Sequence, residues 1–207
     1  MIDWQAAERL ARPGPNRRAA PTRPGHVPGE AGIWVLVGGD LLVFSLFFAV
    51  LMHGRGQDVA GFERARHSLN LIVGTASTLS LLAGSVLVVL GVQAVREGRA
   101  QDAARRFSLT LLCGAAFVAG KILEYAHQLS VGHSPHAHDF FMYYFVLTGV
   151  HLVHTLLAMV LVALMRRTAR TRAVDAHALR TVEAFGVFWH LIDLLWLILF
   201  ALFYLVR

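Results

Sequence analysis

Ionisable side chains interrupt the long apolar runs of this 207-residue chain. An ionised group inside a membrane span costs about 3 kcal/mol, so such groups are usually paired or functional. Their chemistry is that of ion pairing, proton exchange or metal ligation. They are Asp40, Lys121, Glu124, His127, His151, His154, Glu183, His190 and Asp193.

Helical spacing places several of these groups side by side. Lys121 and Glu124 are one turn apart, which predicts a salt bridge within one helix. Glu183, His190 and Asp193 follow one another at intervals of seven and three residues, so they share one stripe of a helix. Because buried polar groups need partners, we expect all five residues to belong to a buried polar network that joins the helices.

Five polar residues lie near the middle of their apolar runs and therefore at a similar depth: Asp40, His151, His154, His190 and Asp193. They predict one polar layer inside a helix bundle. The layer either holds the helices together by hydrogen bonds or carries protons or ions. Asp40 differs from the others because its sequence neighbours include no obvious cation. A transporter built around this layer is disfavoured, because the chain contains no inverted repeat.

Haem ligation is a further alternative. Two histidines on different helices can ligate a haem from both sides, and His151 and His190 are the best pair. Their neighbours include carboxylates and threonines, which are unusual around a haem. The histidines of segment 133–138 are typical of a metal-binding tract, but their spacing matches no established site and predicts a solvated loop. Because Cys113 is the single cysteine, a cysteine cluster is excluded. We therefore expect this chain to bind no metal and to contain no catalytic residue.

The composition predicts a membrane protein. Hydrophobic types make up 56 % of the chain and charged types 15 %, whereas soluble domains carry about 25 % charge. This composition excludes an ordinary soluble enzyme. Since an apolar run of about 20 residues crosses a bilayer as a helix, we predict an all-α bundle of five transmembrane helices. They are expected at 31–52, 69–95, 107–129, 140–165 and 182–206.

The distribution of arginine predicts the orientation. With the N-terminus inside, the inner segments carry 14 arginines and the outer segments four. The positive-inside rule therefore places the N-terminus in the cytoplasm and the C-terminus in the periplasm. The net charge of +6 is explained by basic loops, so no nucleic-acid partner is expected. Residues 1–30, rich in Arg and Pro, are expected to form a cytoplasmic tail, and residues 31–207 the membrane domain.

Small and polar residues form a heptad pattern in the second predicted span. Small residues let two helix backbones approach closely, so the pattern predicts a packing seam. Its members are Asn70, Ser77, Gly84 and Gly91 at intervals of seven, with Gly74 and Thr78 as a second small pair.

Longer motifs occur in four of the predicted spans. They are LNLIVGTAS at 69–77, KILEY at 121–125, FVLTGVHLVH at 145–154, and Glu183-Ala184 followed by WHLIDLLW at 189–196. Together and in this order they resemble subunit III of the haem–copper oxidases, the cytochrome c oxidase subunit 3 family. The resemblance extends over residues 28–207.

Some positions depart from the family pattern. The mitochondrial type has seven helices, whereas this chain resembles the short bacterial form with five. Asp40 stands where the oxidases usually have Glu, and Leu191 replaces a common Phe. The run at 28–44 is most similar to the branch associated with nitric oxide reductase.

The resemblance implies a modest role for this chain. Subunit III binds no haem or copper and packs beside a catalytic haem-containing subunit that holds the redox metals. It forms a lipid-filled V of helices, which implies membrane lipids as partners and a structural phospholipid. Asp40 corresponds to a carboxylate near that cleft, where it is a candidate for proton uptake and lipid contact. His151, His154, Glu183, His190 and Asp193 match polar positions that hold the bundle together.

These inferences converge on a non-catalytic accessory subunit of a respiratory complex in the bacterial inner membrane. The complex is either a nitric oxide reductase or a cytochrome c or quinol oxidase, and this chain supports its stability, lipid binding and proton uptake. The alternative is a small haem-binding membrane anchor that uses His151 and His190.

Overall fold

The computed structural model of this protein describes residues 31–170 and 175–206, and all regular structure in these ranges is helical. The predicted tail, residues 1–30, lies outside the described residues. The elements are α2 (Ala31–Gln57), α3 (Val59–Arg66), α4 (Leu71–Arg96), α5 (Ala100–Ser130), α6 (Asp139–Ala169), α7 (Ala176–Phe200) and a π-helical turn, η1 (Ala201–Leu205).

Five of these helices are long and apolar enough to cross a membrane, which confirms the predicted five-span all-α fold. Most of them extend beyond the predicted bounds. Helix α5, for example, begins at Ala100 rather than at 107. The apolar run measures only the part that suits lipid, whereas the helix continues through its polar end. The short helix α3 was not predicted, because its sequence is too polar to be distinguished from a loop.

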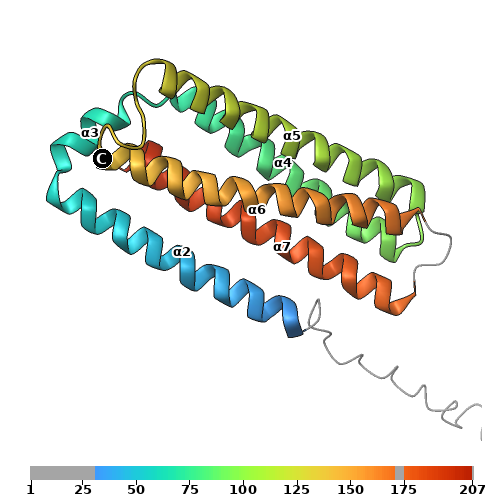
Figure 1. The fold of residues 1–207 in the computed structure, drawn as a ribbon. Coiled ribbons are helices and arrows are strands. Elements are labelled where there is room, and N and C mark those ends of the chain that lie inside the picture. The colour runs from blue at the N-terminus through green and yellow to red at the C-terminus, as the bar shows by residue number, and fades with distance from the viewer. Residues whose placement is uncertain (1–30, 171–174, 207) are drawn as a thin grey trace, which may run out of the picture.

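Helices α4, α5, α6 and α7 pack lengthwise into one bundle, and α2 lies apart beside α6 and α7 (Figure 1). Only 11 % of the most apolar stretch of α2 is buried, against 33–50 % in the other four spans. A pocket of about 320 Å³ opens between the start of α2 and α7. Its lining residues are Gly32, Ile33, Leu36, Thr181, Ala184 and Phe185.

The predicted seam of small residues is the face of α4 that packs against α5 and α7. A Cβ atom on Gly84 would lie 2.9 Å from the Trp189 ring of α7, and one on Gly91 would overlap the Phe107 ring of α5. The backbones therefore approach as closely as glycine permits. Asn70 is the exception, because it is exposed and caps α4 by accepting from the Ile72 amide at 3.0 Å.

The π-helical turn at the end of α7 carries Tyr204 into the bundle. The backbone there is tied to the loop that contains α3, because Arg66 Nη1 donates to the Tyr204 carbonyl at 3.1 Å. Tyr204 is 4 % exposed and stacks on Phe200. A π turn widens the helix locally, and such turns often occur where a side chain is needed at a special position.

Candidate functional site

A closed cluster of four polar side chains, here called the Lys121 cluster, lies between α5, α6 and the end of α7. Lys121 Nζ is 2.7 Å from Glu124 Oε2, 2.9 Å from the Tyr144 hydroxyl and 3.4 Å from the Tyr204 hydroxyl. The Tyr204 hydroxyl donates to the other oxygen of Glu124, Oε1, at 2.5 Å. The structure thus contains the ion pair that the spacing predicts and adds two tyrosines that the sequence reasoning did not assign to it.

The Lys121 cluster is balanced in charge and almost entirely buried. Lys121 is 1 % exposed and Glu124 is 6 % exposed. The ammonium also lies 4.9 Å from the Tyr144 ring centre and 5.0 Å from that of Trp196, within the range of cation–π attraction. A buried ion pair is tolerated when added hydrogen bonds satisfy both partners, as they do here. The cluster therefore joins three helices.

His151 lies deeper along α6 and contacts mainly aromatic rings. It is fully buried, 5.7 Å from the Phe117 ring and 5.3 Å from the Trp196 ring. Its Nε2 is 3.2 Å from the Thr155 hydroxyl, one turn later on the same helix. Trp196 in turn donates to the Thr78 hydroxyl of α4 at 2.9 Å. His151 is thus a core side chain that connects the packing of α5, α6 and α7.

Asp40 of α2 faces His154 of α6. The distance from His154 Nε2 to Asp40 Oδ1 is 3.6 Å, and the side chains are 25 % and 21 % exposed. The Phe44 ring covers the histidine at a centroid distance of 5.6 Å. Asp40 Oδ2 is buried and has no hydrogen-bond partner among the described residues. Sequence reasoning found no cation for Asp40, because its partner comes from a different helix far along the chain.

The geometry of this pair suits the exchange of one proton. His154 Nδ1 is 2.8 Å from the Val150 carbonyl, which can only accept, so Nδ1 carries a hydrogen. In the neutral ring the nitrogen that faces Asp40, Nε2, is then unprotonated. Uptake of a proton at Nε2 would create an imidazolium opposite a carboxylate. The pair bridges α2 and α6 at a partly exposed position.

The remaining predicted residues lie between α4 and α7. Arg96 Nη2 and Glu183 Oε1 form a salt bridge of 2.8 Å. The Ser85 hydroxyl is 2.6 Å from His190 Nδ1, and Asp193 follows one turn later. A pocket of about 170 Å³ runs along this junction and is lined by Arg96, Glu183 and His190, among others. Ser85 and Arg96 are partners that the sequence reasoning missed.

The prediction of one buried polar network is corrected by the structure, which divides these residues into separate groups. Lys121 and Glu124 lie together between α5, α6 and α7, whereas His190 and Glu183 contact α4. His154 faces α2. Equal depth in the bilayer does not place side chains in contact, because each helix turns its polar stripe toward a different neighbour. His151 and His190, the alternative haem ligands, likewise contact different partners, Thr155 and Ser85.

The histidines of segment 133–138 hold the loop between α5 and α6. His133 Nδ1 is 2.7 Å from Gln128 Oε1, and its ring stacks on Phe141 at 4.4 Å. His138 caps α6 by accepting from the Phe140 amide at 3.0 Å, and its Nε2 is 3.2 Å from Asp58 Oδ2. Within the described ranges, no three His, Cys, Asp or Glu side chains are grouped so that they could hold a metal ion.

Asp58, which caps α3, should make stability depend on pH. The Gly61 amide and then the His138 ring lower the pKa of the Asp58 carboxyl below its ordinary value of 3.8. A carboxyl with a lowered folded-state pKa stabilises the fold above its unfolded pKa, and that contribution is lost as the pH falls through the folded value. We expect Asp58→Asn to lower the thermal midpoint in detergent between pH 5 and 7, and the difference from the wild type to begin to shrink below about pH 4. A difference in thermal midpoint that stays constant from pH 7 down to well below pH 4 would contradict the assignment.

A family model for cytochrome c oxidase subunit III matches residues 67–206, which include α4 to α7 and the π-helical turn. The chain is also similar to curated proteins over nearly its whole length. A cytochrome c oxidase subunit 3 from Corynebacterium diphtheriae is 29 % identical over 93 % of this chain and 94 % of the relative.

Other relatives are named as subunits of cytochrome c or ubiquinol oxidases. A probable cytochrome c oxidase subunit 3 from Nocardia farcinica is 31 % identical over 89 % of this chain and 90 % of its own length. A cytochrome bo(3) ubiquinol oxidase subunit 3 from Pseudomonas putida is 25 % identical over 84 % of each chain. The similarity thus extends to α2, beyond the segment that the family model matches.

Proposed function

We propose, from the premise that this chain belongs to the cytochrome c oxidase subunit III family, that it is a non-catalytic accessory subunit of a respiratory haem–copper-type complex. The observation that carries the proposal is the family match over four of the five spans, together with relatives that cover the fifth. The relatives are named as subunits of cytochrome c and ubiquinol oxidases. The partner is then a haem-containing catalytic subunit, which holds the redox metals.

The arrangement of polar groups supports a structural role. The Lys121 cluster and the Arg96–Glu183 and Ser85–His190 contacts each join side chains of different helices. Such contacts hold a bundle together in an apolar solvent, where an unpaired polar group is costly. The bundle then presents a fixed surface to the catalytic subunit.

The separated helix α2 supports a role in lipid binding. Together with α7 it borders the pocket of about 320 Å³, whose lining is mainly apolar apart from Thr181. A phospholipid acyl chain fits such a lining. We propose that lipid fills the space between α2 and the bundle and that Asp40, with His154, exchanges protons at its edge and supports proton uptake by the catalytic subunit.

The proposed location is the inner membrane of a bacterium, with the N-terminus in the cytoplasm. The relatives named above are bacterial proteins. The five spans and the excess of arginine on one side support this orientation. Arg96, Arg99 and Arg170 lie at the same end of the bundle, the proposed cytoplasmic end.

Purification of the tagged chain from native membranes in mild detergent tests the proposal. We expect a large catalytic subunit to copurify and a haem spectrum to follow that subunit. Mass spectrometry then decides between an oxygen reductase and a nitric oxide reductase, the two partners that remain open. A haem spectrum that stays with the isolated 22.8 kDa chain would overturn the proposal and favour ligation by His151 and His190.

Replacing Asp40 by Asn should separate its chemical role from its structural role. The Asp40–His154 pair is long and partly exposed, so its loss should change stability by no more than about 1 kcal/mol. We expect D40N to assemble with the catalytic subunit and to slow proton uptake in stopped-flow measurements on the complex. D40E, which keeps a carboxylate, should recover the rate. Failure of D40N to assemble would mean that Asp40 is structural.

A further inference from the structure

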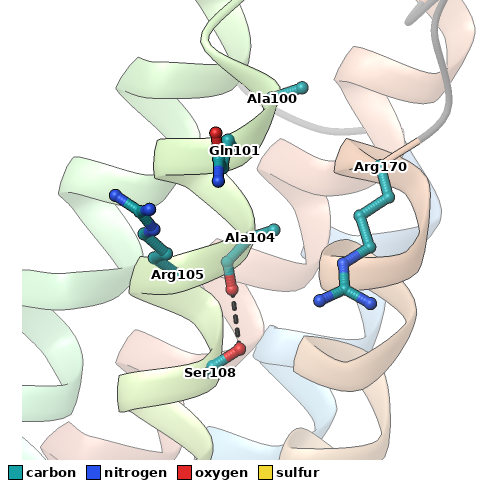
Figure 2. Close-up of a pocket in the computed structure, with 6 residues that line it drawn as sticks. All are labelled: Ala100, Gln101, Ala104, Arg105, Ser108 and Arg170. Atoms are coloured by element: carbon teal, nitrogen blue, oxygen red, sulfur yellow. Dashed lines mark hydrogen bonds between the residues drawn. The ribbon is translucent and has the colours of Figure 1, made fainter.

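A pocket of about 420 Å³ lies between the first turns of α5 and the last turn of α6. Its lining residues are Ala100, Gln101, Ala104, Arg105, Ser108 and Arg170. Figure 2 shows Arg170 reaching along the end of α6, while Gln101 and Ser108 project from α5 and the Arg105 guanidinium lies on the side of α5 away from Arg170. Ser108 donates to the Ala104 carbonyl at 2.8 Å. None of the contacts described above for the polar clusters involves this pocket.

The charge of this pocket is uncompensated. Two of its six lining residues are arginines and none is acidic. Two other arginines at this end of the bundle do have carboxylate partners: Arg96 binds Glu183 at 2.8 Å, and Arg99 binds Asp102 at 2.9 Å and also Glu97. Neither the Arg105 side chain nor the Arg170 side chain has a hydrogen bond or ion pair with any residue that the structure describes. Their guanidinium groups are free to bind an anion.

The start of α5 adds to this positive potential. Its N-cap, Arg99, makes no side-chain capping hydrogen bond, so the first-turn amides are not satisfied by a side chain. The positive end of the helix dipole favours an anion at the same place. The negative end of α6 also lies nearby, and the charge of Arg170 at its C-cap opposes it.

The depth of the pocket matches the phosphate level of a bilayer. Helix α5 has 31 residues. At about 1.5 Å per residue this length exceeds a hydrocarbon core of about 30 Å by roughly 8 Å at each end. Arg105 is the sixth residue of the helix, so it lies about 8 Å from the start and therefore near the boundary between headgroups and hydrocarbon.

We propose that this pocket binds a phosphate-bearing anion, for which Arg105 and Arg170 supply the positive charge and Gln101 an additional donor. Arginine suits phosphate because its planar donors can bind two oxygens at once. The same chemistry is offered by the headgroup of an anionic phospholipid and by a free phosphate compound. This site lies between α5 and α6 and is distinct from the space between α2 and the bundle.

Native mass spectrometry of the full chain in detergent, with titrated phosphatidylglycerol or phosphatidylcholine, tests the proposal. We expect the wild type to bind phosphatidylglycerol more tightly. The double variant R105Q/R170Q should weaken that binding about 30-fold, from roughly fivefold for each arginine. R167Q/R180Q removes two exposed arginines near the same end that do not line the pocket, and serves as the matched control. Inorganic phosphate and glycerol 3-phosphate, added as competitors, identify the source of the anion.

Each outcome decides the proposal. A loss of phosphatidylglycerol binding in R105Q/R170Q but not in the control supports the proposal. The ligand is then a lipid if soluble phosphates do not compete. It is a free phosphate compound if they displace the lipid at low concentration. Equal losses in both double variants would mean general attraction to a basic surface and would overturn the site. Equal binding of both lipids by the wild type, without binding of free phosphate, would overturn it as well. None of these results depends on whether a catalytic subunit copurifies.

Discussion

Replacing Glu124 by Leu should destabilise the folded chain by about 3–5 kcal/mol, because Lys121 would remain as a buried ammonium without its carboxylate. Lys121 is 1 % exposed, so water cannot replace the lost partner. K121M should have a similar effect, since it leaves the Glu124 carboxylate with only the Tyr204 hydroxyl at 2.5 Å. The measurement is the free energy of unfolding in detergent, from titration with sodium dodecyl sulfate.

The double variant K121M/E124L distinguishes an ion pair from simple packing. Replacing both charges by apolar side chains of similar volume is often close to neutral, so the double variant should recover most of the stability that each single variant loses. L123A, at a 71 % exposed position on the same helix, is the control and should change little. Strictly additive losses in the double variant would contradict the coupling.

Replacing Gly91 by Ala should destabilise the bundle by about 1–3 kcal/mol, because the new methyl group would overlap the Phe107 ring. Phe107 is fully buried, so its ring has no space into which to move. The sign of the change in stability is informative, since replacing Gly by Ala in a helix interior otherwise stabilises the helix by about 1 kcal/mol. Replacing Gly91 by Val should destabilise the bundle more than replacing it by Ala. The same detergent titration measures both variants.

Gly149 of α6 offers a matched control for this substitution. A Cβ atom there would have no neighbour within 4 Å, so G149A should be neutral or stabilising. Combining G91A with F107L, which removes the clashing ring edge, should restore part of the loss. If G91A and G149A behave alike, the close approach of α4 and α5 is not needed for stability.

The five spans follow from the sequence because membrane insertion is a local property. The length of an apolar run and the absence of backbone partners in lipid determine a helix without reference to the rest of the chain. Contacts within one helix follow in the same way. Lys121 and Glu124 are three residues apart, and 3.6 residues per turn brings them together in any helix. The heptad of small residues likewise marks one face of α4 as a packing surface.

Tertiary structure decided which face of each helix meets which neighbour. It gave Asp40 a partner in His154, joined Tyr144 and Tyr204 to Lys121, and separated these groups from His190. Depth in the membrane can be read from a sequence, but the rotation of one helix against another depends on how all side chains pack together. Contacts between helices far apart in the chain, and the pocket lined by Arg105 and Arg170, therefore became visible only in the assembled bundle.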